Sequence, residues 1–229
     1  MELLIIILIS VISLITLSIV LKVDLKKIKE LGMDKNLNKL AEKYPSNIEI
    51  CKSILKKLNN EKVKIEEDKE AKTTLYIALT DKIFIADTKE SYTRIQTMSH
   101  ECLHSVQDRR ILMFNFIFSN IYLIYFGAII ILTILKVATN SLLYLSIFLI
   151  LSMVYYMIRA FLENDAMIKA KYLAKEYMEE VQISSKEEIE EIVQGFENLN
   201  NVGIKCVNYD LFFRILIKVI IFSTVALIF

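Results

Sequence analysis

The uncharged run ILMFNFIFSNIYLIYFGAIIILTIL, residues 111–135, decides the fold of this chain. A second uncharged run, residues 137–158, follows after Lys136 alone, and a third occupies residues 3–21. Each run reaches the roughly 20 apolar residues with which an α-helix crosses the hydrocarbon core of a bilayer. The sequence therefore predicts a membrane protein, in agreement with its hydrophobic content of 55%.

A fourth apolar block, residues 211–229, is interrupted by Arg214 and Lys218. Because long basic side chains can extend to the membrane surface, we expect this block to span as well. The first run is expected to remain as a signal-anchor, since no basic residue precedes it and no small-residue cleavage site follows. The expected divisions are a signal-anchor at 1–22, a segment at 23–110, a transmembrane hairpin at 111–158, a segment at 159–210 and a last span at 211–229.

Basic residues predict the orientation of the spans. They gather near one end of each span, in residues 22–29, 109–110, 159–171 and 214–218. Only Lys136 lies at the opposite end, in the short connection between the second and third spans. The positive-inside rule then places both termini outside the cell and segments 22–110 and 159–210 in the cytoplasm.

The first cytoplasmic segment mixes helical and extended patterns. Its helical positions are Leu37, Leu40, Ala41 and Tyr44 before Pro45, and then a second helix that opens with the capping-box residues Ser46 and Glu49. The runs 62–65, 74–79 and 82–86 are rich in β-formers, with a turn at Thr80–Asp81. From about Ser91 the pattern becomes helical. This segment is therefore expected to be a small α+β unit.

The second cytoplasmic segment is helical in pattern from Arg159 to about Gln182. A further amphipathic helix is expected to begin at Ser184 or Ser185. The fold class predicted for the whole chain is mainly α: a polytopic α-helical membrane protein with a small cytoplasmic α+β unit.

The only two histidines stand four residues apart, in His100-Glu101-Cys102-Leu103-His104. On a helix these positions share a face, so both imidazoles can bind one tetrahedral Zn²⁺. Glu101 lies further round the helix, where it can act as general base on the zinc-activated water. Cys102 faces another direction and is expected to take no part. The alternative is a pair of surface histidines on a membrane-proximal helix.

A zinc peptidase needs a third protein ligand and an open fourth position. With both histidines used, this ligand must be a carboxylate or a thiolate, and Glu163 follows the third span directly. The alternatives are that Glu163 merely packs against Arg159, or that Glu176 is the ligand because the histidine-bearing helix runs straight into the membrane. A break at Asp108–Arg110 favours Glu163, since it removes a depth mismatch of roughly 15 Å.

Two motifs carry a resemblance to a known family. They are Ser99-His100-Glu101-x-x-His104-x-x-Gln107 and, after transmembrane runs, Glu163-x-x-Ala166-x-x-x-Ala170-x-x-Leu173. This pattern resembles bacterial membrane-bound neutral zinc metallopeptidases of the gluzincin type, similar in layout to CAAX-prenyl-protease-like membrane peptidases. Over residues 73–173 the resemblance implies a zincin-like unit with ligands His100, His104 and Glu163 and the base Glu101. The chain departs from the pattern at Leu103 and Ser105, which leaves its substrate open.

The function expected from these residues is that of a zinc-dependent membrane metalloendopeptidase, acting on peptides or membrane proteins at the cytoplasmic face of the bilayer. The alternative is a non-enzymatic zinc-binding membrane scaffold or sensor with a degenerate peptidase fold. A site-2-type intramembrane protease is disfavoured, because Asp108, Arg109 and Arg110 separate the motif from the span. Nucleic acid is not an expected partner, since there is no basic stripe with interleaved aromatics.

Three details remain as expectations. Tyr172 and Tyr209 are the candidates for stabilising the oxyanion. The runs 74–79 and 82–86 form either a substrate-binding sheet edge or a hairpin that only supports the motif helix. Cys51, Cys102 and Cys206 all fall in the predicted cytoplasmic segments, where thiols stay reduced, so no disulfide is expected.

Overall fold

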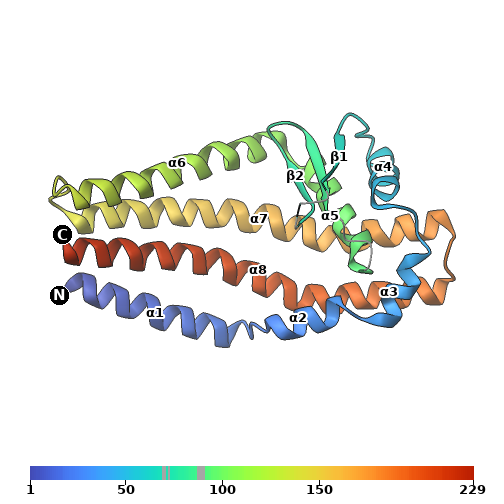
Figure 1. The fold of residues 1–229 in the computed structure, drawn as a ribbon, viewed down its shortest axis with the longest axis horizontal. Coiled ribbons are helices and arrows are strands. Elements are labelled where there is room, and N and C mark those ends of the chain that lie inside the picture. The colour runs from blue at the N-terminus through green and yellow to red at the C-terminus, as the bar shows by residue number, and fades with distance from the viewer. Residues whose placement is uncertain (69–70, 72, 87–90) are drawn as a thin grey trace. The chain divides into compact units, whose positions relative to one another are not determined.

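The computed structural model describes residues 1–68, 71, 73–86 and 91–229 (Figure 1). The chain is mainly helical. Its helices are α1 Glu2–Val20, α2 Leu25–Gly32, α3 Lys35–Glu42, α4 Asn47–Lys57, α5 Thr93–Val106, α6 Arg109–Ile134, α7 Ser141–Val181 and α8 Lys186–Ile228. Its strands are β1 Lys64–Asp68, β2 Leu75–Ile77 and β3 Lys82–Ala86.

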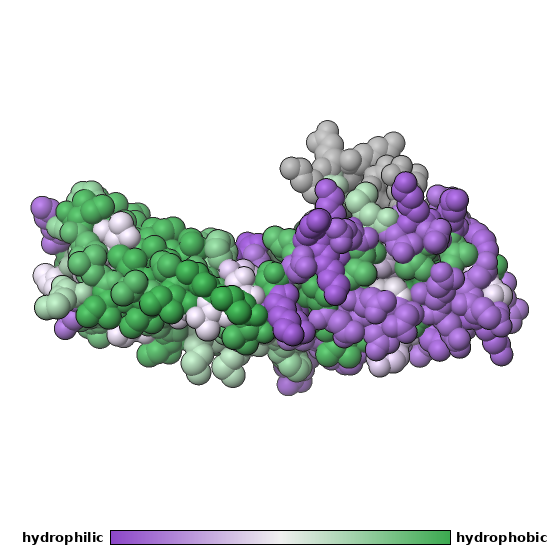
Figure 2. Space-filling view, turned by 90° about the horizontal axis from the view of Figure 1, so that it is seen from below, coloured by the Kyte–Doolittle hydropathy of each residue, from purple (hydrophilic) through white to green (hydrophobic). Residues whose placement is uncertain are grey.

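Contacts divide the chain into two compact units. The first, here called the apolar unit, comprises residues 1–23, 114–161 and 205–229. The second, the polar unit, comprises residues 24–113 and 162–204. In Figure 2 the surface drawn for the apolar helices is almost wholly hydrophobic, whereas hydrophilic side chains cover much of the polar unit. Each unit is described by itself.

The apolar unit contains four helices that are long and apolar enough to cross a membrane, namely α1 and parts of α6, α7 and α8. This confirms the four apolar helices predicted from sequence, while their insertion in a membrane and their sidedness remain predictions. Its core contains Tyr122, Ile129, Phe148, Val219 and Phe222. Large apolar side chains are exposed along α1, where only 6% of the span is buried. Such a surface suits lipid rather than water.

Two expected segment boundaries fall inside continuous helices. The boundary at 158/159 lies within α7 and the boundary at 210/211 lies within α8. Neither helix contains proline, and the glycines of α8, Gly195 and Gly203, are accommodated within its helical backbone. The helix α2 was not expected, because its eight residues carry too short a periodic pattern to stand out.

The sheet of the polar unit has the strand order β1-β3-β2. β2 and β3 are antiparallel, as expected for the hairpin, with Tyr76 opposite Ile83, and Asp81 in the connection has a φ of 51°. β1 pairs in parallel with β3, from Lys64 opposite Lys82 onward. The strands β1 and β2 therefore form the two edges, and β1 begins two residues later than the run 62–65 indicated.

Polar caps fix the small helices. Ser46 and Glu49 form the expected capping box of α4, and Ser185 with Glu188 form another at the start of α8. Arg94, which is 4% exposed, donates through both guanidinium Nη atoms to acceptors at the end of α3 and the start of α4. These acceptors are the carbonyl oxygens of Ala41, Tyr44 and Pro45 and the side-chain oxygen of Asn47, at 2.7–3.0 Å.

The helix carrying the histidines breaks before the second apolar run. Gln107 ends α5 with an extended backbone, ψ 158°, and α6 begins at Arg109. The Asp108 carboxylate accepts from the N–H of Arg110 at 2.8 Å, so it caps α6. The break thus lies at Gln107–Asp108, at the edge of the segment predicted from sequence.

Candidate metal centre

Helix α5 carries both histidines on one face. His100 and His104 are one turn apart, and their Nε2 atoms are 3.0 Å from each other. The two rings are nearly perpendicular, at 89°. The opposite side of α5 is held against α4 by apolar residues such as Ile95, Met98 and Cys102, all fully buried. Packing therefore turns the imidazoles away from the core and toward α7.

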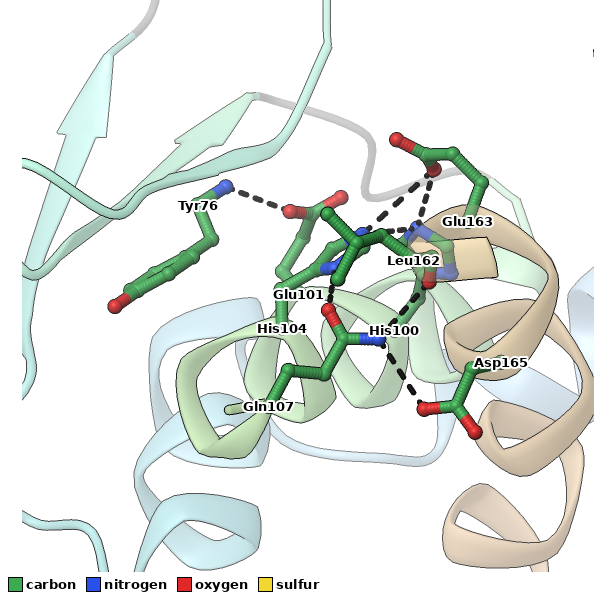
Figure 3. Close-up of polar contacts among 8 residues, drawn as sticks. All are labelled: Tyr76, His100, Glu101, His104, Gln107, Leu162, Glu163 and Asp165. Atoms are coloured by element: carbon green, nitrogen blue, oxygen red, sulfur yellow. Dashed lines mark hydrogen bonds and ion pairs between the residues drawn. The ribbon is translucent and has the colours of Figure 1, made fainter. Parts of the chain in front are cut away.

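Glu163 of α7 completes the group (Figure 3). Its Oε2 lies 3.5 Å from Nε2 of His100 and 3.7 Å from Nε2 of His104. Zinc bound tetrahedrally by ligands at about 2.1 Å would hold its ligand atoms about 3.4 Å apart. The three measured separations, 3.0, 3.5 and 3.7 Å, lie around this value, and two imidazoles with one carboxylate are a zinc donor set. The residues present therefore fit a zinc ion.

The rival acid, Glu176, lies elsewhere on α7. Its carboxylate is 3.1 Å from Nζ of Lys57 on α4, and its side chain is 57% exposed. The structure brings Glu163, and not Glu176, to the histidines. The break between α5 and α6 accounts for this choice, because it removes the constraint that α5 continue straight into the apolar run.

Gln107 orients His104 through Nδ1, the ring nitrogen that does not face Glu163. The Oε1 of Gln107 lies 2.8 Å from Nδ1 of His104. Its amide nitrogen donates to the carbonyl oxygen of Leu162 at 2.9 Å and to the carboxylate of Asp165 at 3.2 Å. Because these two acceptors require the NH₂ group, the amide oxygen must face His104 and accept its Nδ1–H. Nε2 of His104 is then left with the lone pair that a metal needs.

Asp165 contacts His104 indirectly, by accepting a hydrogen bond from the Gln107 amide, and Lys169 holds its other carboxylate oxygen at 2.5 Å. Hydrogen bonds from Lys169 and Gln107 outweigh partial burial and lower the pKa of Asp165. Asp165 is therefore a charged acceptor that keeps the Gln107 amide turned one way.

Glu101 is buried beside the ligand group. Only 8% of the residue is exposed, and its Oε2 accepts a hydrogen bond from the backbone N–H of Tyr76 in β2 at 2.6 Å (Figure 3). Burial raises the pKa of this carboxyl, although His100, His104 and the Tyr76 N–H act in the opposite direction. A carboxylate with a raised pKa holds a proton more readily, as a general base working near neutral pH requires.

The sequence did not indicate a role for Tyr76. Its N–H turns away from β3 and toward Glu101, and its hydroxyl donates to Asp81 at 2.9 Å. Only the antiparallel pairing of β2 with β3 determines which backbone groups point outward, and the alternating pattern of 74–79 does not contain this information. Gln107 stood in the quoted motif, but its contact with Leu162 joins α5 to α7 across 55 residues of sequence, which no local pattern indicates.

The remaining candidates lie outside these contacts. Tyr172 is 57% exposed on α7, with Nζ of Lys171 4.8 Å from its ring centroid. Tyr209 belongs to the apolar unit and its ring lies 6.2 Å from that of Phe213. Cys102 is fully buried, with its sulfur 3.5 Å from that of Cys51. All three cysteines are free.

Comparison with models of known protein families found no match, and comparisons with curated proteins and with solved structures found no similar protein. The resemblance to neutral zinc metallopeptidases accordingly stays a prediction.

Proposed function

We propose that the chain is a zinc-dependent membrane metalloendopeptidase that hydrolyses peptide bonds at the cytoplasmic face of the bilayer. The observation that carries this proposal is the approach of His100, His104 and Glu163 within 4.8 Å of one another, with the buried carboxylate of Glu101 beside them. A site that only stored zinc would have no need of a fourth, non-ligating acid held in place by a backbone N–H.

The residues of the metal centre take separate roles in the proposed hydrolysis. His100, His104 and Glu163 would hold the ion. Zinc, when bound, supplies a Lewis acid that polarises the substrate carbonyl and lowers the pKa of water toward neutrality. Glu101, fixed at Oε2 by the Tyr76 N–H, takes a proton from the attacking water at its other oxygen. It then delivers this proton to the leaving amine nitrogen as the C–N bond breaks.

The edge strand β2 offers a binding position for an extended substrate. β2 is the outer strand next to β3, and the outward N–H of Tyr76 faces the metal centre through Glu101. Because the Tyr76 N–H is already donated to Glu101, a peptide aligned along this edge would be bound through the remaining outward main-chain groups of β2, largely independent of its own side chains. Of the two interpretations of the β-rich runs, we therefore favour a substrate-binding edge.

The membrane placement is part of the proposal. Four helices have the length and composition for spanning, and basic residues gather at one end of each apolar run. A cysteine introduced at Thr139 should react with a membrane-impermeant maleimide added outside intact cells, whereas one introduced at Lys186 should not. The reverse pattern would place the metal centre on the outer side.

The decisive experiment compares the full-length chain with its Glu101→Gln variant in detergent micelles. Both should contain about one zinc per chain, because the three ligands remain. Hydrolysis of an unfolded protein such as casein should fall by roughly 10²–10⁴ in the variant, the range of general acid–base catalysis. Zinc binding without hydrolysis by the unsubstituted chain would favour the scaffold or sensor. Equal hydrolysis by both would remove Glu101 from the mechanism.

A further inference from the structure

Lys218 lies on the inward-facing side of α8. Leu211, Ile215 and Phe222 are buried on this face, and Lys218 follows Ile215 by three positions and precedes Phe222 by four. Residues three and four apart on a helix share a face. Lys218 is itself partly exposed, so its ammonium group stands where the helix meets its neighbours and can still be reached.

The ammonium group also lies deep along the apolar helices. Nζ of Lys218 is 5.0 Å from the ring centroid of Tyr122 in α6. Uncharged residues 111–121 precede Tyr122 and residues 123–135 follow it, which gives about 16–20 Å of apolar helix on either side. In α8 itself, the uncharged residues 219–229 follow Lys218 over about 16 Å of helix, and Arg214 precedes it by one turn. The contact with Tyr122 therefore places Lys218 well inside the apolar run of α6 and one turn deeper along α8 than Arg214.

The contacts of Lys218 leave its charge without a counter-ion. Its Nζ has the Tyr122 ring beneath it and a long hydrogen bond, 3.5 Å, to the carbonyl oxygen of Arg214. Asp210 is occupied by Arg214, at 2.6 Å. Across the described part of the chain no carboxylate forms an ion pair with Lys218. An unneutralised ammonium in this position is unfavourable, and such residues mark binding sites and ion pairs.

We propose that Lys218 binds the carboxylate of an Asp or Glu in the transmembrane helix of a partner protein. Charge complementarity requires an anion, and depth favours a side chain of a helix over a lipid phosphate, which lies outside the hydrocarbon core. A second copy of this chain cannot supply the group, because residues 3–21, 111–135, 137–158 and 211–229 contain no acid. The inference rests on the proposed membrane insertion and is independent of peptidase activity.

The test uses the full-length chain in phosphatidylcholine vesicles with a labelled model peptide, a leucine–alanine transmembrane helix with one central Asp. Association is measured by energy transfer, against matched peptides with central Asn or with Asp at the helix end. We expect the central-Asp peptide to bind about tenfold more tightly than both, the scale of polar contacts between membrane helices. Lys218→Met should abolish this preference, while Arg214→Met should retain it.

Each other outcome overturns the proposal. Equal binding of the Asp and Asn peptides, or an undiminished preference in Lys218→Met, would show that the ammonium does not select a carboxylate. Loss of the preference on adding phosphatidylglycerol, with lipid binding that depends on Lys218, would assign the site to a lipid headgroup. Casein hydrolysis and zinc content, measured on the same vesicles, report separately on the proposed peptidase.

Discussion

Arg94 in the polar unit and Lys218 in the apolar unit are both basic residues on inward-facing helix surfaces, and they differ in their partners. Arg94 meets four oxygen acceptors from α3, α4 and the residues between them. Lys218 meets an aromatic ring and one carbonyl at 3.5 Å. A buried cation whose Nη atoms donate to four oxygen acceptors holds a fold together, whereas a partly exposed cation without a counter-ion points to a partner outside the chain.

The same contrast applies to the acids of α7 and gives the largest expected effect. Glu163 faces two histidines, whereas Glu176 faces Lys57 at an exposed position. Glu163→Ala should lower zinc affinity by more than the roughly 10–100-fold typical of an outer-shell change. Glu176→Ala should leave it unchanged, since exposed ion pairs contribute little. Competition with a fluorescent chelator measures both, and the opposite ranking would move the ligand to Glu176.

Arg94→Met and Lys218→Met make the comparison of the two cations directly. The first substitution removes four hydrogen bonds and should destabilise the polar unit by about 3 kcal/mol, because buried carbonyls lose their donor. The second should change stability by less than about 1 kcal/mol, or raise it, since no paired charge is lost. Thermal unfolding of both variants in one detergent gives the two values. Similar losses would mean that Lys218 is also structural.

Gln107 offers a smaller and more specific test within the polar unit. Gln107→Glu keeps an acceptor for His104 but removes the donor to Leu162 and sets two carboxylates together at Asp165. Zinc affinity should fall by roughly 10–100-fold. Adding Asp165→Asn should restore part of the loss, because the new amide can donate to the introduced carboxylate. Nitrogen chemical shifts of His104 in the metal-free protein should show that Nδ1 stays protonated, because the introduced carboxylate still accepts its N–H. Loss of that proton would contradict the orientation assigned to Gln107.

Cys102→Ala should have the smallest effect on the metal. The Cys102 sulfur faces Cys51 in the core and not the histidine side of α5. Zinc content should match that of Cys206→Ala, a substitution in the apolar unit. Stability should fall by about 1 kcal/mol through lost packing. Loss of zinc specific to Cys102→Ala would bring sulfur into the coordination sphere.

Local patterns allowed much of this arrangement to be predicted. Uncharged runs identify the apolar helices, Ser46 and Glu49 identify the start of α4, and the charges after Gln107 locate the break before α6. Spacing alone placed His100 and His104 together. Glu163 was proposed as the third ligand because it follows the third apolar run, whereas the contacts that the sequence did not indicate join distant segments that no local pattern pairs. The parallel pairing of β1 with β3 and the N–H of Tyr76 at Glu101 are of this kind.

The hydrogen bond between Tyr76 and Glu101 has a consequence for which proteins the proposed enzyme would leave uncleaved. Glu101 is held by a main-chain N–H of a three-residue strand. A substrate aligned along that strand must be an unfolded, extended polypeptide. Compactly folded proteins present no such extended segment, whatever their sequence. Damaged or incompletely synthesised chains do present an extended segment. Folded proteins would then escape cleavage because their backbones are not extended. A proline that stiffens the extended segment would protect a substrate in the same way.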